Sequence, residues 1–175
     1  MNTKTKAQYV NISILSKYEI FNSLSEKNIE HFCEVIEVLE YESGDTIIKE
    51  GEVGDSLLLL LDGTVEISQA LTLKTDMSGI DTREKSLIKL SSTARPFFGE
   101  MSLFSDDDKR TATVKASTKC LVGRISRVDF FQICNSNPTI GNIVMQNIAR
   151  VLTERLKQAN QNVLKLTTAL SLLIE

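Results

Sequence analysis

An apolar repeat near the C-terminus constrains the fold of this chain more than any other feature. Its members are separated alternately by four and three residues: Met145, Ala149, Leu152, Leu156, Ala159, Val163, Leu166, Leu170 and Leu173. The mean period is about 3.5 residues, as in a coiled coil, whereas a helix packed on its own domain drifts towards about 3.6. We predict one continuous helix over residues 139–174, with this heptad seam along one side.

The length of this helix implies a partner. At about 1.5 Å per residue, it spans roughly 54 Å, more than a small domain can cover. We expect the seam to pack against the same helix of a second copy, which gives a homodimer through the helix 139–174. The alternative is a helix that folds back or frays at its end.

The composition excludes several classes of protein. The 175 residues are 42% hydrophobic and 25% charged, with a net charge of −3, so no general attraction to nucleic acid or anionic lipid is expected. The three cysteines lack Cys-x-x-Cys spacing, which argues against disulfides and zinc and favours a cytoplasmic location. The polar N-terminus is unlike a signal peptide, and no apolar run approaches the about 20 residues of a membrane span.

Short apolar segments separated by turns fill the middle of the chain. Strands are expected at 46–48, 57–61, 65–68, 87–90, 97–98, 112–116 and 121–125. Turns are expected at 42–45, at 51–55 with two glycines that can take positive φ, and at 62–63, and a long loop at 72–86. The pattern predicts an α+β fold, a β-barrel or jelly roll (double-stranded β-helix) with flanking helices and a long C-terminal coiled-coil helix.

Capping residues mark the flanking helices. Ser25 is a good N-cap for a helix over 26–37, and Asn137 caps the last helix, with Pro138 in its first turn. A short helix over 127–134 lies between them. We divide the chain into an N-terminal arm or helix (1–17), a barrel domain (18–136) and a dimerisation helix (137–175).

The residues with the clearest chemistry lie between 97 and 114. Gly99 ends an apolar strand, and a helical turn begins at Glu100, so its first backbone N–H groups are available to an anion. Ser102 adds a hydroxyl, and Arg110 supplies a planar fork suited to phosphate oxygens. A carboxylate would repel that anion unless it faces a donor such as a ribose hydroxyl. The combination suits a sugar phosphate better than free phosphate.

Two motifs in this stretch resemble those of the cyclic nucleotide-binding domain family, which includes the catabolite activator protein, kinase regulatory domains and gated channels. They are Phe98-Gly99-Glu100-Met101-Ser102-Leu103 and Arg110-Thr111-Ala112-Thr113-Val114. The glycines at 44, 51, 54 and 63 also match, so that the resemblance covers about residues 18–150. It implies a regulatory protein whose ligand is cAMP or cGMP, with no further cofactor, and which signals to a downstream protein not identified by the sequence.

The resemblance also implies roles for individual residues. Glu100 would accept a hydrogen bond from the ribose 2′-hydroxyl, and Arg110 would pair with the cyclic phosphate. Thr111 occupies a position at which some relatives contact guanine. The remaining expected contacts are backbone groups of Gly99, Met101, Ser102 and Ala112, and an apolar wall from Leu90 and Phe98. The last helix near 148–152 would act as a lid.

Some positions depart from the family pattern and leave affinity and base preference open. Lys109 replaces a common Pro, Arg95-Pro96 replaces a common Gly-Asp, and the loop 72–86 is longer than usual. Two simpler interpretations also remain. Arg110 could pair with the acidic run 106–108, and Glu100 could only cap its own helix.

Other function classes have less support. A metal enzyme of barrel type needs several histidines, and His31 is the only one, so we expect no catalytic residues and no metal site. The catabolite activator protein reads DNA with a domain that follows the long helix. Here the sequence stops after that helix, and residues 139–175 hold four basic against two acidic residues, so no DNA binding is expected. The remaining alternative is a nucleotide-independent, dimeric interaction protein.

Overall fold

The computed structural model describes residues 3–70, 84–105 and 109–174 of the chain. Its helices are α1 (Thr3–Tyr9), α2 (Ile12–Leu15), η1 (Glu19–Phe21), α3 (Glu26–Val35), η2 (Ser92–Ala94), α4 (Met101–Phe104), α5 (Arg127–Ser136) and α6 (Pro138–Ile174). Its strands are β1 (Glu37–Tyr41), β2 (Thr46–Ile48), β3 (Ser56–Asp62), β4 (Thr64–Ala70), β5 (Glu84–Ser91), β6 (Phe97–Phe98), β7 (Thr113–Ala116) and β8 (Cys120–Ser126).

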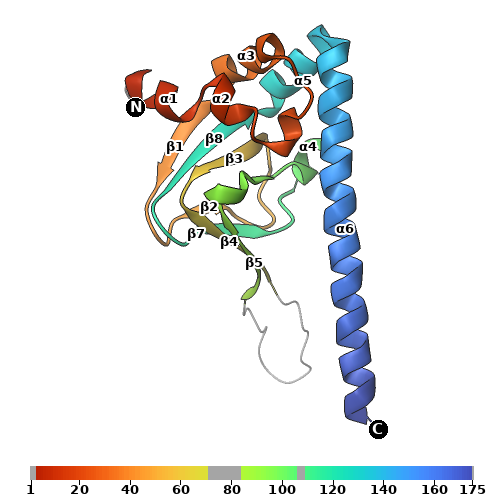
Figure 1. Cartoon of the computed structure of the whole chain (residues 1–175). Helices are drawn as coiled ribbons and strands as arrows, with labels where there is room; N and C mark the ends of the chain where they lie inside the picture. The colour runs from red at the N-terminus through yellow and green to blue at the C-terminus, as the bar shows by residue number, and fades with distance from the viewer. Residues whose placement is uncertain (1–2, 71–83, 106–108, 175) are drawn as a thin grey trace.

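The strands form two antiparallel sheets of four, in the orders β1-β8-β3-β6 and β2-β7-β4-β5. Helices α1, α2, α3 and α5 lie at one end of the sheets, and α6 runs along the side of the molecule (Figure 1). This arrangement confirms the predicted jelly roll with flanking helices and a long C-terminal helix. The site described below lies on the second sheet, on the side that α6 passes.

Strand β3 joins the two hydrophobic cores. Successive side chains of a strand point to opposite faces. Accordingly, Leu57, Leu59 and Leu61 belong to one cluster, and Leu58 and Leu60 belong to the other. Burial on both faces explains why this strand is a continuous run of leucine instead of an alternating one.

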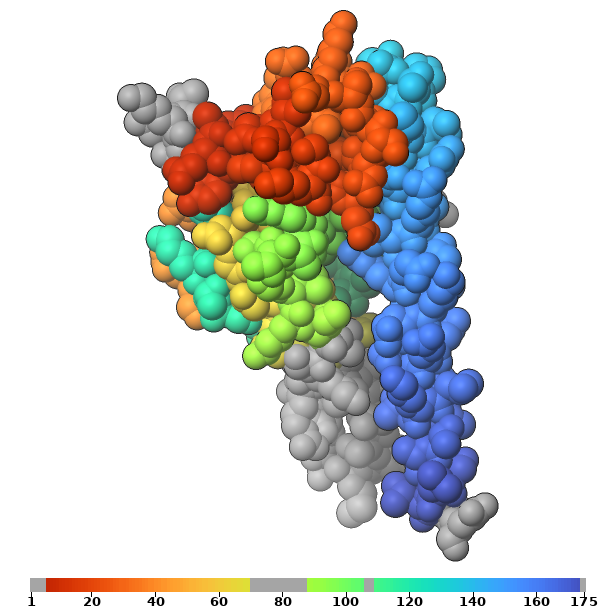
Figure 2. All heavy atoms as spheres, in the orientation of Figure 1, coloured from red at the N-terminus to blue at the C-terminus, as the bar shows by residue number. Residues whose placement is uncertain are grey.

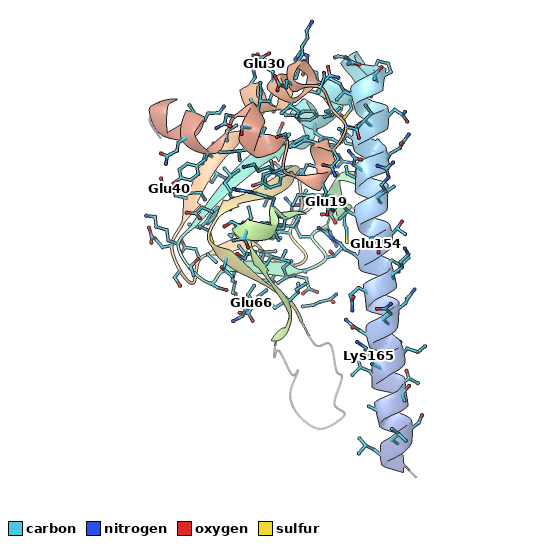
Figure 3. The ribbon with its side chains drawn as sticks, viewed as in Figure 1. Glu19, Glu30, Glu40, Glu66, Glu154 and Lys165 are labelled. Carbon is cyan, nitrogen blue, oxygen red and sulfur yellow. The ribbon has the colours of Figure 1, made fainter. Side chains whose placement is uncertain are left out.

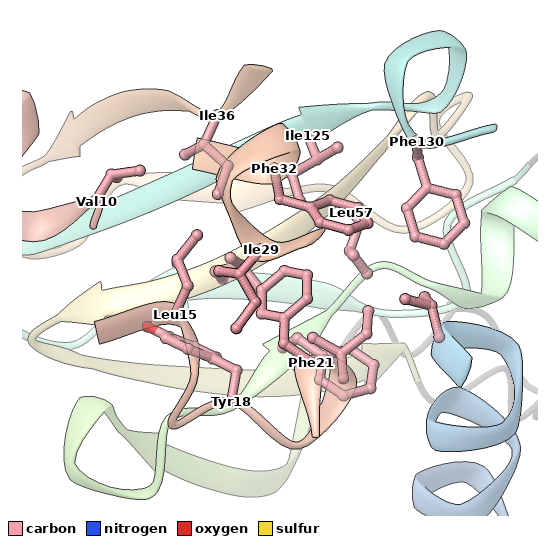
Figure 4. Packing of buried hydrophobic residues seen from close by; sticks show 14 of the residues in the cluster. Val10, Leu15, Tyr18, Phe21, Ile29, Phe32, Ile36, Leu57, Ile125 and Phe130 are labelled. Atoms are coloured by element: carbon pink, nitrogen blue, oxygen red, sulfur yellow. The ribbon is translucent and has the colours of Figure 1, made fainter. Parts of the chain in front are cut away.

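The first core lies between the β1-β8-β3-β6 sheet and the helices. Phe21 and Phe32 pack with ring centroids 4.8 Å apart, and Leu57 and Phe130 adjoin them (Figure 4). Tyr18 is fully buried there, and its hydroxyl donates to the carbonyl of Leu60 over 2.7 Å. Burial raises the pKa of the Tyr18 phenol, with the cation of Arg95 opposing the shift.

The predicted helix caps are present in the structure. The Ser25 hydroxyl accepts from the N–H of Asn28, and the Asn137 side chain accepts from the N–H groups of Thr139 and Ile140. Helix α5 continues two residues beyond the predicted 127–134, since the N–H of Asn137 still bonds to the carbonyl of Ile133.

One predicted loop is partly wrong. Residues 84–86 of the expected loop 72–86 belong to β5, because they pair with β4 from Ser68↔Ser86 to Ala70↔Glu84. The rest of that loop up to residue 83 lies outside the described residues, as do the acidic residues 106–108. No helix within the described ranges is long and apolar enough to cross a membrane.

Helix α6 changes its environment along its length. Ile140, Val144 and Ile148 recur at helical spacing and are buried in the first core. From Leu156 onward every member of the heptad seam is exposed, including Ala159. The distal part of α6 extends beyond the barrel (Figures 1 and 2), and polar side chains such as Lys165 project from it (Figure 3).

Candidate functional site

A cavity of about 370 Å³ lies between the β2-β7-β4-β5 sheet, α4 and α6. Strands β2, β4 and β7 supply an apolar wall of Ile48, Ile67 and Val114. Eight of the residues singled out in the sequence also line it: Phe98, Gly99, Glu100, Met101, Ser102, Arg110, Thr111 and Ala112. The ninth, Leu90, is half-buried against the second core and does not line the cavity, so of the two expected wall residues only Phe98 lines it.

Arg110 is 9% exposed and already satisfies much of its donor capacity within the protein. Its Nη1 donates to the carbonyl of Gly99 at 2.9 Å, to the carbonyl of Ser56 at 3.0 Å and to Oγ of Ser102 at 2.8 Å. Its Nη2 donates to Oγ of Ser56 at 3.0 Å. Burial lowers the pKa of Arg110, and the charges of Asp55 and Glu100 oppose the shift. The guanidinium is therefore held rigidly at the cavity wall.

Two glycines make room for this guanidinium. A Cβ atom at Gly99 would lie 2.5 Å from Nη1 of Arg110, and one at Gly54 would lie 2.6 Å from its Nε and would also overlap the Ser102 hydroxyl. Gly99 has a φ of +82°, and of the two glycines in the 51–55 turn only Gly51 takes positive φ. Gly54 is needed for close packing, whereas Gly51, at φ +82°, fits the turn prediction.

Glu100 lines the cavity and carries one unpaired carboxylate oxygen. The residue is 2% exposed, and its Oε1 accepts from Nη1 of Arg155 at 2.7 Å. Its Oε2 is buried and has no hydrogen-bond partner among the described residues. The carboxylate makes no capping bond to α4, so the capping interpretation does not account for it. A buried carboxylate oxygen left unpaired is costly unless a donor reaches it.

Arg155 of α6 reaches the same site and was missed by the sequence analysis. Its Nη2 donates to the carbonyl of Phe97 at 2.7 Å, and its guanidinium carbon lies 5.2 Å from the centroid of the Phe97 ring. The helix therefore meets the cavity here and not at the expected lid residues 148–152, of which Ile148 and Leu152 pack on the first core. Arg155 lies three residues after Leu152 and so on the same side of the helix, and this spacing could have indicated that its side chain turns towards the barrel.

The remaining predicted residues occupy the rim. Ser102 Oγ donates to the carbonyl of Gly99 at 3.0 Å and accepts from Arg110. Met101 is exposed, and the hydroxyl of Thr111 contacts its sulfur at 3.6 Å. The Ser102 hydroxyl thus serves mainly to position Arg110.

The histidine and the cysteines, which would be needed for a metal site or disulfides, lie away from this cavity. His31 is exposed on α3 and lines a separate groove with Asp129 and Ile140, far along the sequence from the motifs. The three cysteines are free thiols, and Cys120 and Cys134 are buried. Over the described ranges, no group of three or more His, Cys, Asp or Glu side chains could hold a metal ion.

Comparisons with known proteins agree with this geometry. The sequence model of the Cyclic nucleotide-binding domain matches residues 38–137. The cAMP-activated global transcriptional regulator CRP of Pasteurella multocida is 30% identical over 135 residues, which cover 77% of this chain and 58% of that protein. The cGMP-dependent protein kinase, isozyme 1, of Drosophila melanogaster is 31% identical over 105 residues, which cover 60% of this chain and 12% of the kinase.

A solved structure supports the fold. The cyclic nucleotide-binding domain from Methylobacillus flagellatus superposes with a TM-score of 0.73 at 24% identity, covering 92% of this chain and 83% of that one. The chain spans about half the length of the first curated relatives that it matches. The match to the family spans more than half of the chain and includes both motifs at the cavity. This chain therefore belongs to the cyclic nucleotide-binding domain family.

Proposed function

We propose that the chain is a non-enzymatic sensor that binds cAMP or cGMP in the cavity beside Glu100 and Arg110. The proposal extends to a homodimer formed through α6, which passes the signal to a downstream protein in the cytoplasm. DNA and membrane are not among the proposed partners. Relatives whose names mention cAMP and cGMP match comparably, so they do not select the base.

The unpaired Oε2 of Glu100 is the observation that carries the proposal. A ribose hydroxyl can donate to this oxygen while Oε1 remains bonded to Arg155. The neighbouring Arg110 supplies positive charge for the cyclic phosphate. Because the carboxylate is almost fully buried, a hydroxyl donor there gains a charge-assisted hydrogen bond in a poorly hydrated setting.

The contact between Arg155 and Glu100 supports a path from ligand to helix. A ligand that moves Glu100 or Phe97 also moves the anchor of α6, beyond which the seam is exposed. Binding would then favour one of two positions of α6, and the dimer would present a different surface in each.

One observation favours the alternative, a dimeric interaction protein that needs no nucleotide. Both terminal nitrogens of Arg110 already donate to protein oxygens, so a phosphate has to share or replace those bonds. The two proposals differ in whether any cyclic nucleotide binds.

Calorimetric titration of the purified chain with cAMP and with cGMP separates them. We expect micromolar or tighter binding of at least one nucleotide. Arg110→Ala and Arg110→Lys should both abolish or strongly weaken it, since neither keeps the planar fork. Arg150→Ala, which removes an arginine of α6 bonded only to Asn147 in the described structure, is the matched control. Absence of heat and of a thermal shift with both nucleotides would favour the alternative.

A further inference from the structure

The polar groups that line the cavity are divided between two places. Glu100, Ser102, Arg110 and Arg155 gather beside α4, where the proposed sugar phosphate would bind. The strand wall next to them is apolar. On that wall, Gln69 of β4 adds a side-chain amide and Thr111 adds a hydroxyl.

The register of the sheet fixes where Gln69 lies. Ile67 pairs with Val114 and Ser68 pairs with Thr113 across β4 and β7. This pairing ends at Ser68↔Thr113, so Gln69 is the first residue of β4 beyond it and lies at the end of the wall towards Ala112. Because side chains alternate along a strand, Gln69 follows Ile67 on the face that lines the cavity, while Glu66 lies on the other face and pairs with Lys89.

The Gln69 side chain is free to meet a ligand. The residue is exposed, and its amide makes no hydrogen bond to the residues that the structure describes. An amide offers two donors and one acceptor, which is the complement of a purine edge. Thr111 is less available, because its hydroxyl contacts the Met101 sulfur.

We propose that Gln69 determines which purine the cavity prefers, by hydrogen bonding to the edge of the base. This inference rests on the proposed function: a ribose held at Glu100 and a phosphate held at Arg110 leave the apolar strand wall for the base. A base that packs on this wall lies beside Gln69, which follows Ile67 along β4. The matched relatives include proteins named for cAMP and for cGMP, so they do not indicate which base is preferred. A residue near the base has to determine that preference.

Dissociation constants for cAMP and cGMP, measured by calorimetry on three variants, test this role. Gln69→Glu leaves only acceptors, which suit the N1–H and 2-amino donors of guanine and face the ring acceptors of adenine unfavourably. We expect the ratio of the two dissociation constants to move towards cGMP by about tenfold or more, as for one good base contact. Gln69→Leu should weaken the nucleotide preferred by the wild type about tenfold. Gln132→Glu, the same change at an exposed glutamine of α5, should leave the ratio unchanged.

The outcomes distinguish this role from the proposed function. If the wild type and both Gln69 variants bind with the same ratio within twofold, Gln69 does not read the base, and the proposed function stands. If the wild type binds neither nucleotide, the proposed function fails, and the role of Gln69 fails with it. Gln69 is exposed, so both substitutions should leave the fold intact, and thermal melting without ligand checks this.

Discussion

The position of Arg110 depends on neighbouring residues that have no side chain. Gly54 and Gly99 together leave the space in which the guanidinium lies, and Ser56 and Ser102 hold it there by hydrogen bonds. One methyl group added at either glycine would disturb this site, because the interior is close-packed and the added carbon would meet the guanidinium itself.

We expect Gly54→Ala to weaken cyclic nucleotide binding about tenfold or more and to lower the free energy of unfolding by about 1–3 kcal/mol, the usual cost of overpacking. The added Cβ overlaps Ser102 and Arg110, so the guanidinium has to move. Gly51→Ala is the matched control. A Cβ there meets nothing within 4 Å, and its φ of +82° costs stability alone. Titration and urea unfolding of both variants measure this, and equal binding by the two would contradict the packing argument.

Tyr18 makes stability depend on alkaline pH. Its folded pKa is raised, so the phenol stays protonated in the fold at a pH where the unfolded chain ionises, near 10. The stabilisation is present below that pH and is lost as the pH rises above it. We expect Tyr18→Phe to be less stable than wild type by about 1–3 kcal/mol at pH 7, since the Leu60 carbonyl loses its donor.

Urea unfolding between pH 7 and pH 11 checks this prediction. The difference between the two proteins should shrink above pH 10. Burial raises the pKa of Cys134 to about 11. This thiol is present in both proteins, so its titration cancels in the difference between their free energies of unfolding. A constant difference across the range would show that the phenol does not titrate as described.

At the scale of elements, Arg155 joins α6 to the segment that carries Phe97 and Glu100. Arg155 bonds at once to the Glu100 carboxylate and to the backbone of β6, 55 and 58 residues away in sequence. Glu100 is buried, so loss of the cation leaves a charged group without a partner inside the protein.

Arg155→Gln should therefore lower the free energy of unfolding by about 1–3 kcal/mol, the cost of an unsatisfied buried acceptor. Partial exposure of the Arg155 side chain favours the lower part of that range. Lys157→Gln, at an exposed lysine of α6 that pairs with the exposed Glu154, should change stability by less than about 0.5 kcal/mol. Denaturant unfolding of the two variants measures both, and equal losses would remove the special role of Arg155.

The sequence allowed the elements to be predicted better than the contacts between them. The five-leucine run, the Ser25 and Asn137 caps and the two motifs each have a local cause, and each was found. Arg155 and Gln69 were not found, because nothing local shows which side chain of a helix or strand reaches a cavity built by other elements. Gly54 was noted as a family glycine, but its close packing on Arg110 could not be predicted, because Arg110 lies far along the chain.

At the scale of the whole molecule, α6 leaves the barrel with its seam exposed. Leu156, Val163, Leu166, Leu170 and Leu173 are all more than half exposed in the single chain. Burial of such a stripe in a coiled coil would remove several large apolar side chains from water, each worth about 1.5–3 kcal/mol. The proposed dimer follows from this surface.

Leu166→Glu should convert a dimer of the 19.5 kDa chain into a monomer, because it places a charge in the middle of the seam. Leu164→Glu is the matched control: Leu164 is 72% exposed but lies off the heptad positions. Sedimentation or light scattering gives the masses. A monomeric wild type, or dissociation caused by both variants alike, would contradict a dimer through this seam.

The affinity of the chain for cAMP, cGMP and their 2′-deoxy analogues tests the central claim most directly, since only the hydroxyl assigned to Glu100 Oε2 differs within each pair. We predict that the better-bound nucleotide loses at least about tenfold in affinity on removal of this hydroxyl, as expected for a hydrogen bond to a buried charge of about 1.5–3 kcal/mol. Equal affinity of the parent and deoxy nucleotides, or no binding of any of them, would contradict it.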